Sequence, residues 1–244
     1  MNKFNCLICK GEVLYEKETK PRTCYYCKEI YESSIVCKNG HYVCDSCHSS
    51  DALKIITNYC LKSTSTSPLQ MALDLMKHPS VNMHGPEHHY LVPAVLTTAF
   101  LNKNNKQEIL EKLLNEAQKR SKNVLGGFCG FYGACGAGVG CGIYTSLVQE
   151  ASPLSENEWG LCNLMTSKAL ENISKSGGPR CCKRDSFLAI ESAIEFSREY
   201  LDTELDLYPD LRCTFSNINK ECLVGKCKFH AVNKVDTLDE VNAF

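Results

Sequence analysis

Cysteine constrains this chain more than any other residue type. Seventeen of its 244 residues are cysteine, and they are grouped rather than evenly spread. The first residues, MNKFNCLICKG, hold no apolar stretch of signal-peptide length, so we expect a cytoplasmic protein. Thiols are kept reduced there, and clustered cysteines bind metal or supply reactive sulfur rather than form disulfides. The sequence therefore predicts metal sites with thiolate ligands.

The N-terminal thiols occur in pairs at metal-ligand spacing. Two residues between thiols let a tight turn direct both sulfurs at one tetrahedral ion, and four pairs supply two zinc ions. Some 50 mainly polar residues also lack the core to fold without metal. The predicted ligand pairs are Cys6-x2-Cys9, Cys24-x2-Cys27, Cys37-x3-His41 and Cys44-x2-Cys47.

Two ligand pairings are open in this region. Consecutive pairing would place the first two pairs on one ion, whereas interleaved pairing would join Cys24 and Cys27 to Cys44 and Cys47. A helix predicted over residues 51–60 resembles the closing helix of a treble-clef finger, which favours interleaving. Seven Lys/Arg against six Asp/Glu in residues 1–50 give no phosphate-binding surface, so we expect a protein partner or a structural role rather than nucleic acid.

The composition changes along the chain and predicts two domains. Residues 1–60 form a zinc-binding, treble-clef or ribbon-like domain, and residues 61–68 form a polar linker containing KSTSTSP. Residues 69–244 lack strand-like alternation and form a mostly α-helical, cysteine-rich domain. Helices are predicted over 69–77, from Pro93 through AVLTTAFLN, and over 106–119, 161–174 and 185–201.

Charge and hydropathy exclude two classes of partner. The formal net charge is −1, so no general attraction to nucleic acid or anionic lipid is expected. Residues 123–149 carry no charge and exceed the about 20 residues that a spanning helix needs. Eight glycines in GGFCGFYGACGAGVGCG, residues 126–142, disfavour insertion. We expect a buried, closely packed segment and no membrane association.

This glycine-rich segment has two interpretations. Glycine at every second or third position permits close packing of backbones. Alternatively, backbone N–H groups at Gly136 and Gly138 face an anion or a cluster, with Cys129 and Cys135 as ligands or nucleophiles. GAGVG also matches the loose glycine pattern of nucleotide-binding methyltransferases, but no strand is visible before it.

Two further thiol groups lie toward the C-terminus. In GGPRCCKR, Cys181 and Cys182 fall at the predicted N-terminus of a helix among Arg180, Lys183 and Arg184, so lowered thiol pKa values are expected. The third group has thiolate spacing that suits either zinc or an iron–sulfur cluster. Its residues are Cys213, Cys222, Cys227 and His230.

HGPEHHY adds His84, Glu87, His88 and His89 before an apolar run. Imidazoles with a carboxylate can ligate metal or transfer protons. Histidines at a helix start also serve as capping or surface residues, and this alternative stays open.

Together, HGPEHHYLVPAVL, GGFCGFYGACGAGVG, GGPRCCKR and C-x7-EC-x4-C resemble an uncharacterised cysteine-rich family of anaerobic bacteria and methanogens. The resemblance covers roughly residues 70–230. That family is similar to modules found alone or beside radical-SAM and methyltransferase-like proteins. The resemblance implies that the cysteines of these motifs act as one site, and it carries over no established activity.

The sequence thus favours a metal-binding protein of anaerobic metabolism, a redox or sulfur-handling enzyme with a thiolate-ligated centre in its second domain. The centre is an iron–sulfur cluster or a second zinc site. Cys181 or Cys182 would be the reactive thiol, with His84, His88 and His89 handling protons.

A methyltransferase that uses S-adenosylmethionine or a metal-bound thiolate is one alternative. The other is a non-enzymatic adaptor that docks a protein through its zinc domain. The thiols predicted to converge are Cys129, Cys135, Cys181, Cys182, Cys213, Cys222 and Cys227.

Overall fold

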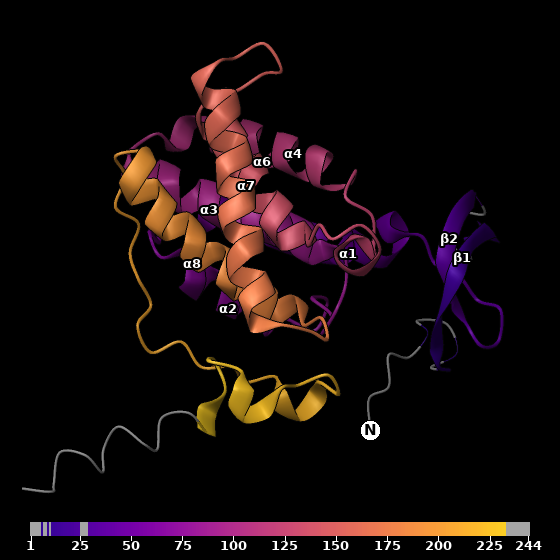
Figure 1. Ribbon diagram of the computed structural model, residues 1–244. Coiled ribbons are helices and arrows are strands. Elements are labelled where there is room, and N and C mark those ends of the chain that lie inside the picture. Colours follow the sequence, from indigo (N-terminus) through magenta and orange to yellow (C-terminus); the bar gives the residue numbers. More distant parts are fainter. Residues whose placement is uncertain (1–5, 7–8, 10, 25–28, 233–244) are drawn as a thin grey trace, which may run out of the picture.

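A computed structural model describes residues 6, 9, 11–24 and 29–232. The fold is mostly helical, with a small two-stranded sheet near the N-terminus that stands to one side of the helices (Figure 1). The strands are β1 (Val13–Thr23) and β2 (Ile30–Cys37). The helices are α1 (Asp45–Lys62), α2 (Pro68–Met76), α3 (Glu87–Lys103), α4 (Leu110–Ser121), α5 (Phe128–Phe131), α6 (Gly136–Val148), α7 (Asn157–Ser176) and α8 (Cys182–Tyr200).

The two strands form an antiparallel hairpin that the sequence did not predict. They pair from Val13 with Cys37 to Thr23 with Ile30, and the register shifts between Tyr15 and Lys20. Most hairpin side chains are exposed or half-buried, so the strands lack the apolar alternation that identifies a half-buried strand. Pairing at the Val13 end places Cys37 close to the first cysteine pair.

Helix α1 joins the hairpin to the helical body. Its C-terminal half contributes Ile56 and Cys60 to the core of the helices. The domain boundary at 61–68 therefore stays a prediction, since α1 ends at Lys62 and already belongs to the helical core by its packing.

Helix α3 lies at the centre of the helical body. Fifteen of its 17 residues are buried, and α1, α2, α4, α6 and α8 all contact it. The prediction that this helix starts near Pro93 is wrong, because α3 begins six residues earlier, at Glu87. Pro93 offers no N–H to the His89 carbonyl, and α6 packs at this point: a Cβ on Gly140 would lie 3.2 Å from that oxygen.

The glycines of α6 serve helix packing, as the first interpretation of this segment predicts. A Cβ on Gly136 would meet the His89 ring at 2.1 Å, and one on Gly138 would meet Leu170 at 2.7 Å. Gly136 and Gly140 thus face α3, while Gly138 and Gly142 face α7. A role for Gly136 and Gly138 in cofactor binding stays a prediction.

The remaining helix predictions are confirmed in position. Segments 69–77, 106–119, 161–174 and 185–201 correspond to α2, α4, α7 and α8. Within the described part of the chain, none of the helices combines the length and the apolar character needed to cross a bilayer.

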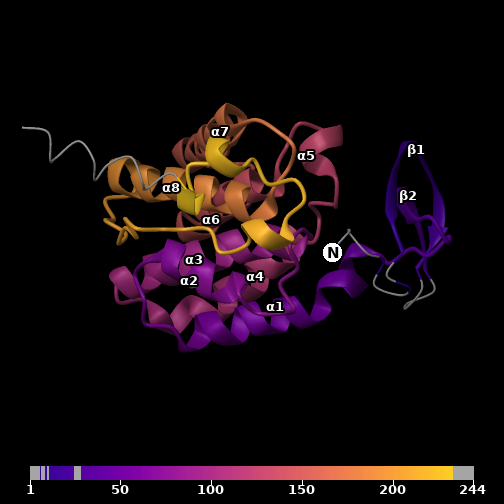
Figure 2. The same ribbon diagram turned by 90° about the horizontal axis from the view of Figure 1, so that it is seen from below.

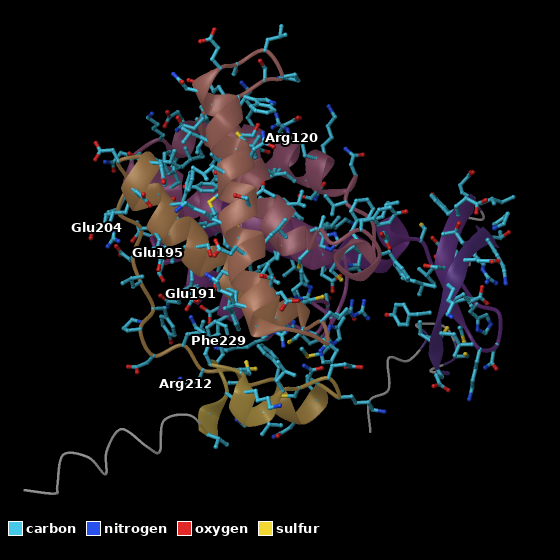
Figure 3. The ribbon with its side chains drawn as sticks, viewed as in Figure 1. Arg120, Glu191, Glu195, Glu204, Arg212 and Phe229 are labelled. Carbon is cyan, nitrogen blue, oxygen red and sulfur yellow. The ribbon has the colours of Figure 1, made fainter. Side chains whose placement is uncertain are left out.

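After α8 the chain turns back as an irregular C-terminal segment, which lies below the helices in Figure 1 and in front of them in Figure 2. It contains two short 3-10 turns, Ser216–Ile218 and Val224–Lys226. Phe229, labelled in Figure 3, packs edge-on against Phe187 of α8, with ring centroids 5.3 Å apart. Phe215 and Phe229 are both buried, so this segment is anchored to the helices by aromatic side chains.

Candidate metal centres

Four predicted ligands meet at the end of the hairpin. The ligand atoms of Cys6, Cys9, Cys37 and His41 all lie within 4.8 Å of one another. Cys9 and Cys37 Sγ are 3.5 Å apart, and His41 Nδ1 is 3.3 Å from Cys9 Sγ. Zinc–sulfur bonds of about 2.3 Å in a tetrahedron put sulfurs about 3.8 Å apart. This group can bind a metal ion, and its geometry is consistent with zinc.

Backbone and side-chain donors contact two of these sulfurs, although burial raises the pKa of the Cys37 thiol. Asn39 donates from Nδ2 to Cys9 Sγ and from its backbone N–H to Cys37 Sγ, each at 3.3 Å. The Asn39 amide and the Gly11 backbone N–H lower the pKa of Cys9 to about 6. Asn39 was not predicted as a site residue. Its position two residues after a ligand cysteine was the sequence feature that could have identified it.

This grouping follows the interleaved pairing, since the first pair shares a site with the third. The second pair has a matching neighbour: the backbone N–H of Cys44 donates to Cys24 Sγ at 3.3 Å. Cys27 and the side chain of Cys47 lie outside the described residues, so their part in a second site stays a prediction.

A second group of thiols lies between the helices and the C-terminal segment. Cys181, Cys213, Cys222 and Cys227 line one cavity of about 20 Å³. Cys181 precedes α8, whereas the other three belong to the C-terminal segment. Thirty-one residues separate Cys181 from Cys213 in the chain, so the fold brings together thiols that are distant in sequence.

Three of these sulfurs accept N–H bonds from nearby residues. The backbone N–H groups of Arg184, Phe215 and Val224 donate to Cys181, Cys213 and Cys222, at 3.5, 3.4 and 3.4 Å. In addition, Asn219 Nδ2 donates to Cys181 Sγ at 3.4 Å. Such bonds stabilise thiolates.

Among the residues that the structure describes, one group of ligand atoms is compact enough to hold a metal ion, Cys6, Cys9, Cys37 and His41. The four thiols of the C-terminal cavity do not form such a group in this structure.

The lowered pKa values expected for Cys181 and Cys182 are contradicted. Burial raises the pKa of Cys181 to about 11 and raises that of Cys182 further, which outweighs the nearby cations. Those cations are also engaged elsewhere: Lys183 Nζ donates to the carbonyls of Met76 and Val81. Arg184 pairs with Asp185 at 3.0 Å and donates to the carbonyls of Gly177 and Pro179. A bound metal cation would supply the compensation that these side chains do not.

The other three predicted thiols form a separate set. Cys129 and Cys182 line a cleft of about 1030 Å³ between the hairpin and the helical body, with Arg180 beside them. Cys135 is the N-cap residue of α6 and is not among the residues that line this cleft. Cys181 and Cys182 are consecutive but face different sites, so the seven thiols are divided between two neighbouring sets.

The three predicted histidines do not converge on a single site, and each has its own hydrogen-bond partner. His84 Nδ1 accepts the Cys182 N–H at 3.4 Å, and its Nε2 donates to Asn219 Oδ1 at 3.2 Å. His88 is buried against the Gly85 carbonyl, and His89 Nδ1 donates to the Val124 carbonyl at 2.8 Å. Burial lowers the pKa of His84 to about 4, so this imidazole is neutral at pH 7. A role for the histidines in proton transfer stays a prediction.

His84 and Asn219 connect the two thiol sets. One hydrogen-bonded chain runs from the Cys182 backbone through His84 and Asn219 to Cys181 Sγ. Asn219 was not predicted as a site residue, because an asparagine between two ligand cysteines has no distinctive spacing.

Comparison with known proteins identifies a family. The profile of a family of unknown function, DUF5714, matches residues 56–230. This range includes both thiol sets of the helical body and excludes the hairpin. No curated protein matches the chain. No solved structure matches it either.

Proposed function

We propose that this chain, which belongs to the DUF5714 family of unknown function, is a redox or sulfur-handling metalloprotein. Its C-terminal cavity would hold an iron–sulfur cluster on Cys181, Cys213, Cys222 and Cys227. The N-terminal hairpin would hold zinc and would have a structural role.

The observation that carries the proposal is the convergence of four cysteines on one cavity. Four thiolates are the usual ligand set of an iron–sulfur cluster. The cavity measures about 20 Å³, so binding of a cluster core would require outward movement of the irregular segment that carries three of the four thiols.

The surroundings of the cavity favour electron transfer or sulfur chemistry over a purely structural role. Phe187, Phe229 and Leu223 line it and surround the sulfurs with apolar side chains. Hydrogen bonds from Arg184 and Asn219 converge on Cys181. Burial and hydrogen bonds to ligand sulfurs are the protein's means of setting a cluster's reduction potential.

The methyltransferase alternative gains no support from the glycine-rich segment. The described residues before Gly136 form α5 and a turn rather than the strand that a nucleotide-binding fingerprint requires.

Anaerobic purification followed by iron and acid-labile sulfide analysis tests the proposal. The full chain should contain both, and Cys222→Ser should remove them while zinc stays bound at the hairpin. Cys162→Ser is the control, because this half-buried thiol lies on α7 away from both thiol sets. A colourless protein that contains zinc and no iron would contradict the proposal.

A further inference from the structure

His84 and Asn219 lie in the wall between the cleft and the C-terminal cavity. His84 is among the residues that line the cleft, and Asn219 is among those that line the cavity. Both are buried. His84 lies just before α3, whereas Asn219 belongs to the irregular C-terminal segment, 135 positions further along the chain. Their contact therefore joins two distant parts of the chain beside the Cys181 sulfur.

The backbone determines which ring nitrogen of His84 carries a proton. The Cys182 N–H lies 3.4 Å from His84 Nδ1, and a backbone N–H can only donate. Nδ1 is therefore an acceptor, so the ring is neutral and its proton is on Nε2. A carboxylate oxygen of Glu221 lies 3.6 Å from Nε2, and this acceptor agrees with the assignment.

Two donors determine how the Asn219 amide is oriented. The Glu221 backbone N–H donates to Asn219 Oδ1 at 3.1 Å, and His84 Nε2 donates to the same oxygen at 3.2 Å. Because both partners are donors, the carbonyl oxygen must face them and the NH2 group must face the other way. That group lies 3.4 Å from the Cys181 sulfur. The amide is thus held in the orientation that donates to sulfur.

The opposite orientation of this amide is unfavourable. A rotated Asn219 side chain would direct its NH2 group at two N–H donors and its oxygen at the sulfur. Buried polar groups that lose their partners cost the full free energy of their desolvation. The His84 Nε2–H is one of the two donors that oppose the rotation, and it is the one that comes from outside the C-terminal segment.

We propose that His84 is a positioning residue for the Cys181 sulfur: it holds the Asn219 amide so that the NH2 group donates to that sulfur. Its effect on a metal centre rests on the proposed function, in which Cys181 is a cluster ligand. Hydrogen bonds to ligand sulfurs set the reduction potential of a cluster. His84 thus acts on the potential without touching the cluster, through Asn219.

Redox titration of the reconstituted full-length protein tests this role. His84→Leu removes one donor from Asn219 Oδ1, so the amide can rotate and the potential should fall, as it should in Asn219→Leu. His84→Gln should restore the wild-type potential, because its amide offers an oxygen and an N–H group in place of Nδ1 and Nε2. His78→Leu is the matched control, since His78 is an exposed histidine that lines the same cleft.

A double variant distinguishes positioning from a general structural effect. If His84 acts through Asn219, adding His84→Leu to Asn219→Leu should lower the potential no further. Additive falls would show that His84 acts by another route and would overturn the proposal. An unchanged potential in His84→Leu would also overturn it, because the Glu221 N–H alone would then orient the amide.

Nuclear magnetic resonance tests the positioning without a cluster. In the full-length protein before iron is added, the side-chain NH2 signals of Asn219 are identified by their loss in Asn219→Leu. They should move in His84→Leu and return in His84→Gln. Unchanged signals in His84→Leu would contradict the positioning role even if the protein binds iron. Signals that move in a protein that binds no iron would instead refute the proposed cluster and leave the positioning role intact.

The wild-type protein supplies a further readout if His84→Leu fails to fold, as judged by circular dichroism. The nitrogen chemical shifts of the His84 ring should show an unprotonated Nδ1 and a protonated Nε2. A proton on Nδ1 would be incompatible with acceptance of the Cys182 N–H and would overturn the proposal.

Discussion

At the residue scale, the thiols are distinguished by the donors around them. Cys37, Cys213 and Cys222 each accept an N–H from the residue two positions on. This repeated turn presents a sulfur and its donor together, which favours the thiolate that a metal requires. Cys181 adds a side-chain donor, Asn219, and this makes it the most tunable ligand of the C-terminal cavity.

Replacing Asn219 should change the potential of the proposed cluster. Asn219→Leu removes a hydrogen bond to the Cys181 sulfur, which leaves more negative charge on the ligand and stabilises the oxidised cluster. We expect a lower reduction potential with unchanged iron content, measured by redox titration followed by electron paramagnetic resonance. Asn217→Leu is the matched control because Asn217 is exposed. Equal potentials in the two variants would show that Asn219 does not act on the cluster.

At the element scale, the glycine-bearing helix α6 organises the helical body. It packs on α3 through one glycine pair and on α7 through the other. Amphipathic helices such as α4 were predictable because a single apolar face has a clear period. Helix α6 was not predictable, because glycines and apolar residues occupy all of its faces. The hairpin was not predictable either, because both of its faces are largely exposed.

A methyl group at the α3–α6 contact should destabilise the fold. In Gly140→Ala the new Cβ would lie 2.9 Å from Cδ of Pro93, whose ring cannot turn aside. We expect a loss of about 1–3 kcal/mol in the free energy of unfolding. The control is Gly160→Ala on α7, where a Cβ meets nothing within 4 Å.

Gly160→Ala should instead stabilise the protein by about 0.5–1 kcal/mol through helix propensity. Denaturant unfolding under anaerobic conditions measures both variants. Equal stability of Gly140→Ala and the wild type would refute the close contact.

At the scale of the whole molecule, different interactions stabilise the hairpin and the helical body. Among the residues that the structure describes, the hydrophobic core begins at Ala52 and includes no hairpin side chain. The hairpin contacts the helical body through the hydrogen bond that Arg180 donates to the Tyr15 hydroxyl. A metal ion bound by Cys6, Cys9, Cys37 and His41 would stabilise its open end.

Loss of the hairpin metal should therefore leave the helices folded. Cys37→Ser removes one ligand of the Cys6, Cys9, Cys37 and His41 group, so the protein should lose one zinc ion. Far-UV circular dichroism should keep its helical signal, with Cys162→Ser as the control. Collapse of the helical signal together with the loss of zinc would show that the two parts fold as one unit.

The sequence located the thiols but could not assign them to sites. Pair spacing identified the hairpin ligands because a CxxC turn is local. Cys181 and Cys182 are adjacent in the chain, yet they line different cavities, and only the path of α8 and the C-terminal segment decides this. The prediction of lowered thiol pKa values was wrong for the same reason, because burial is a property of the tertiary fold.

The central claim is that Cys181, Cys213, Cys222 and Cys227 hold an iron–sulfur cluster. Anomalous diffraction from crystals grown anaerobically tests it most directly, with data collected at the iron and zinc absorption edges. We predict a strong iron-edge peak among these four sulfurs and a zinc-edge peak at the hairpin. A zinc signal in the C-terminal cavity without an iron signal would contradict the account.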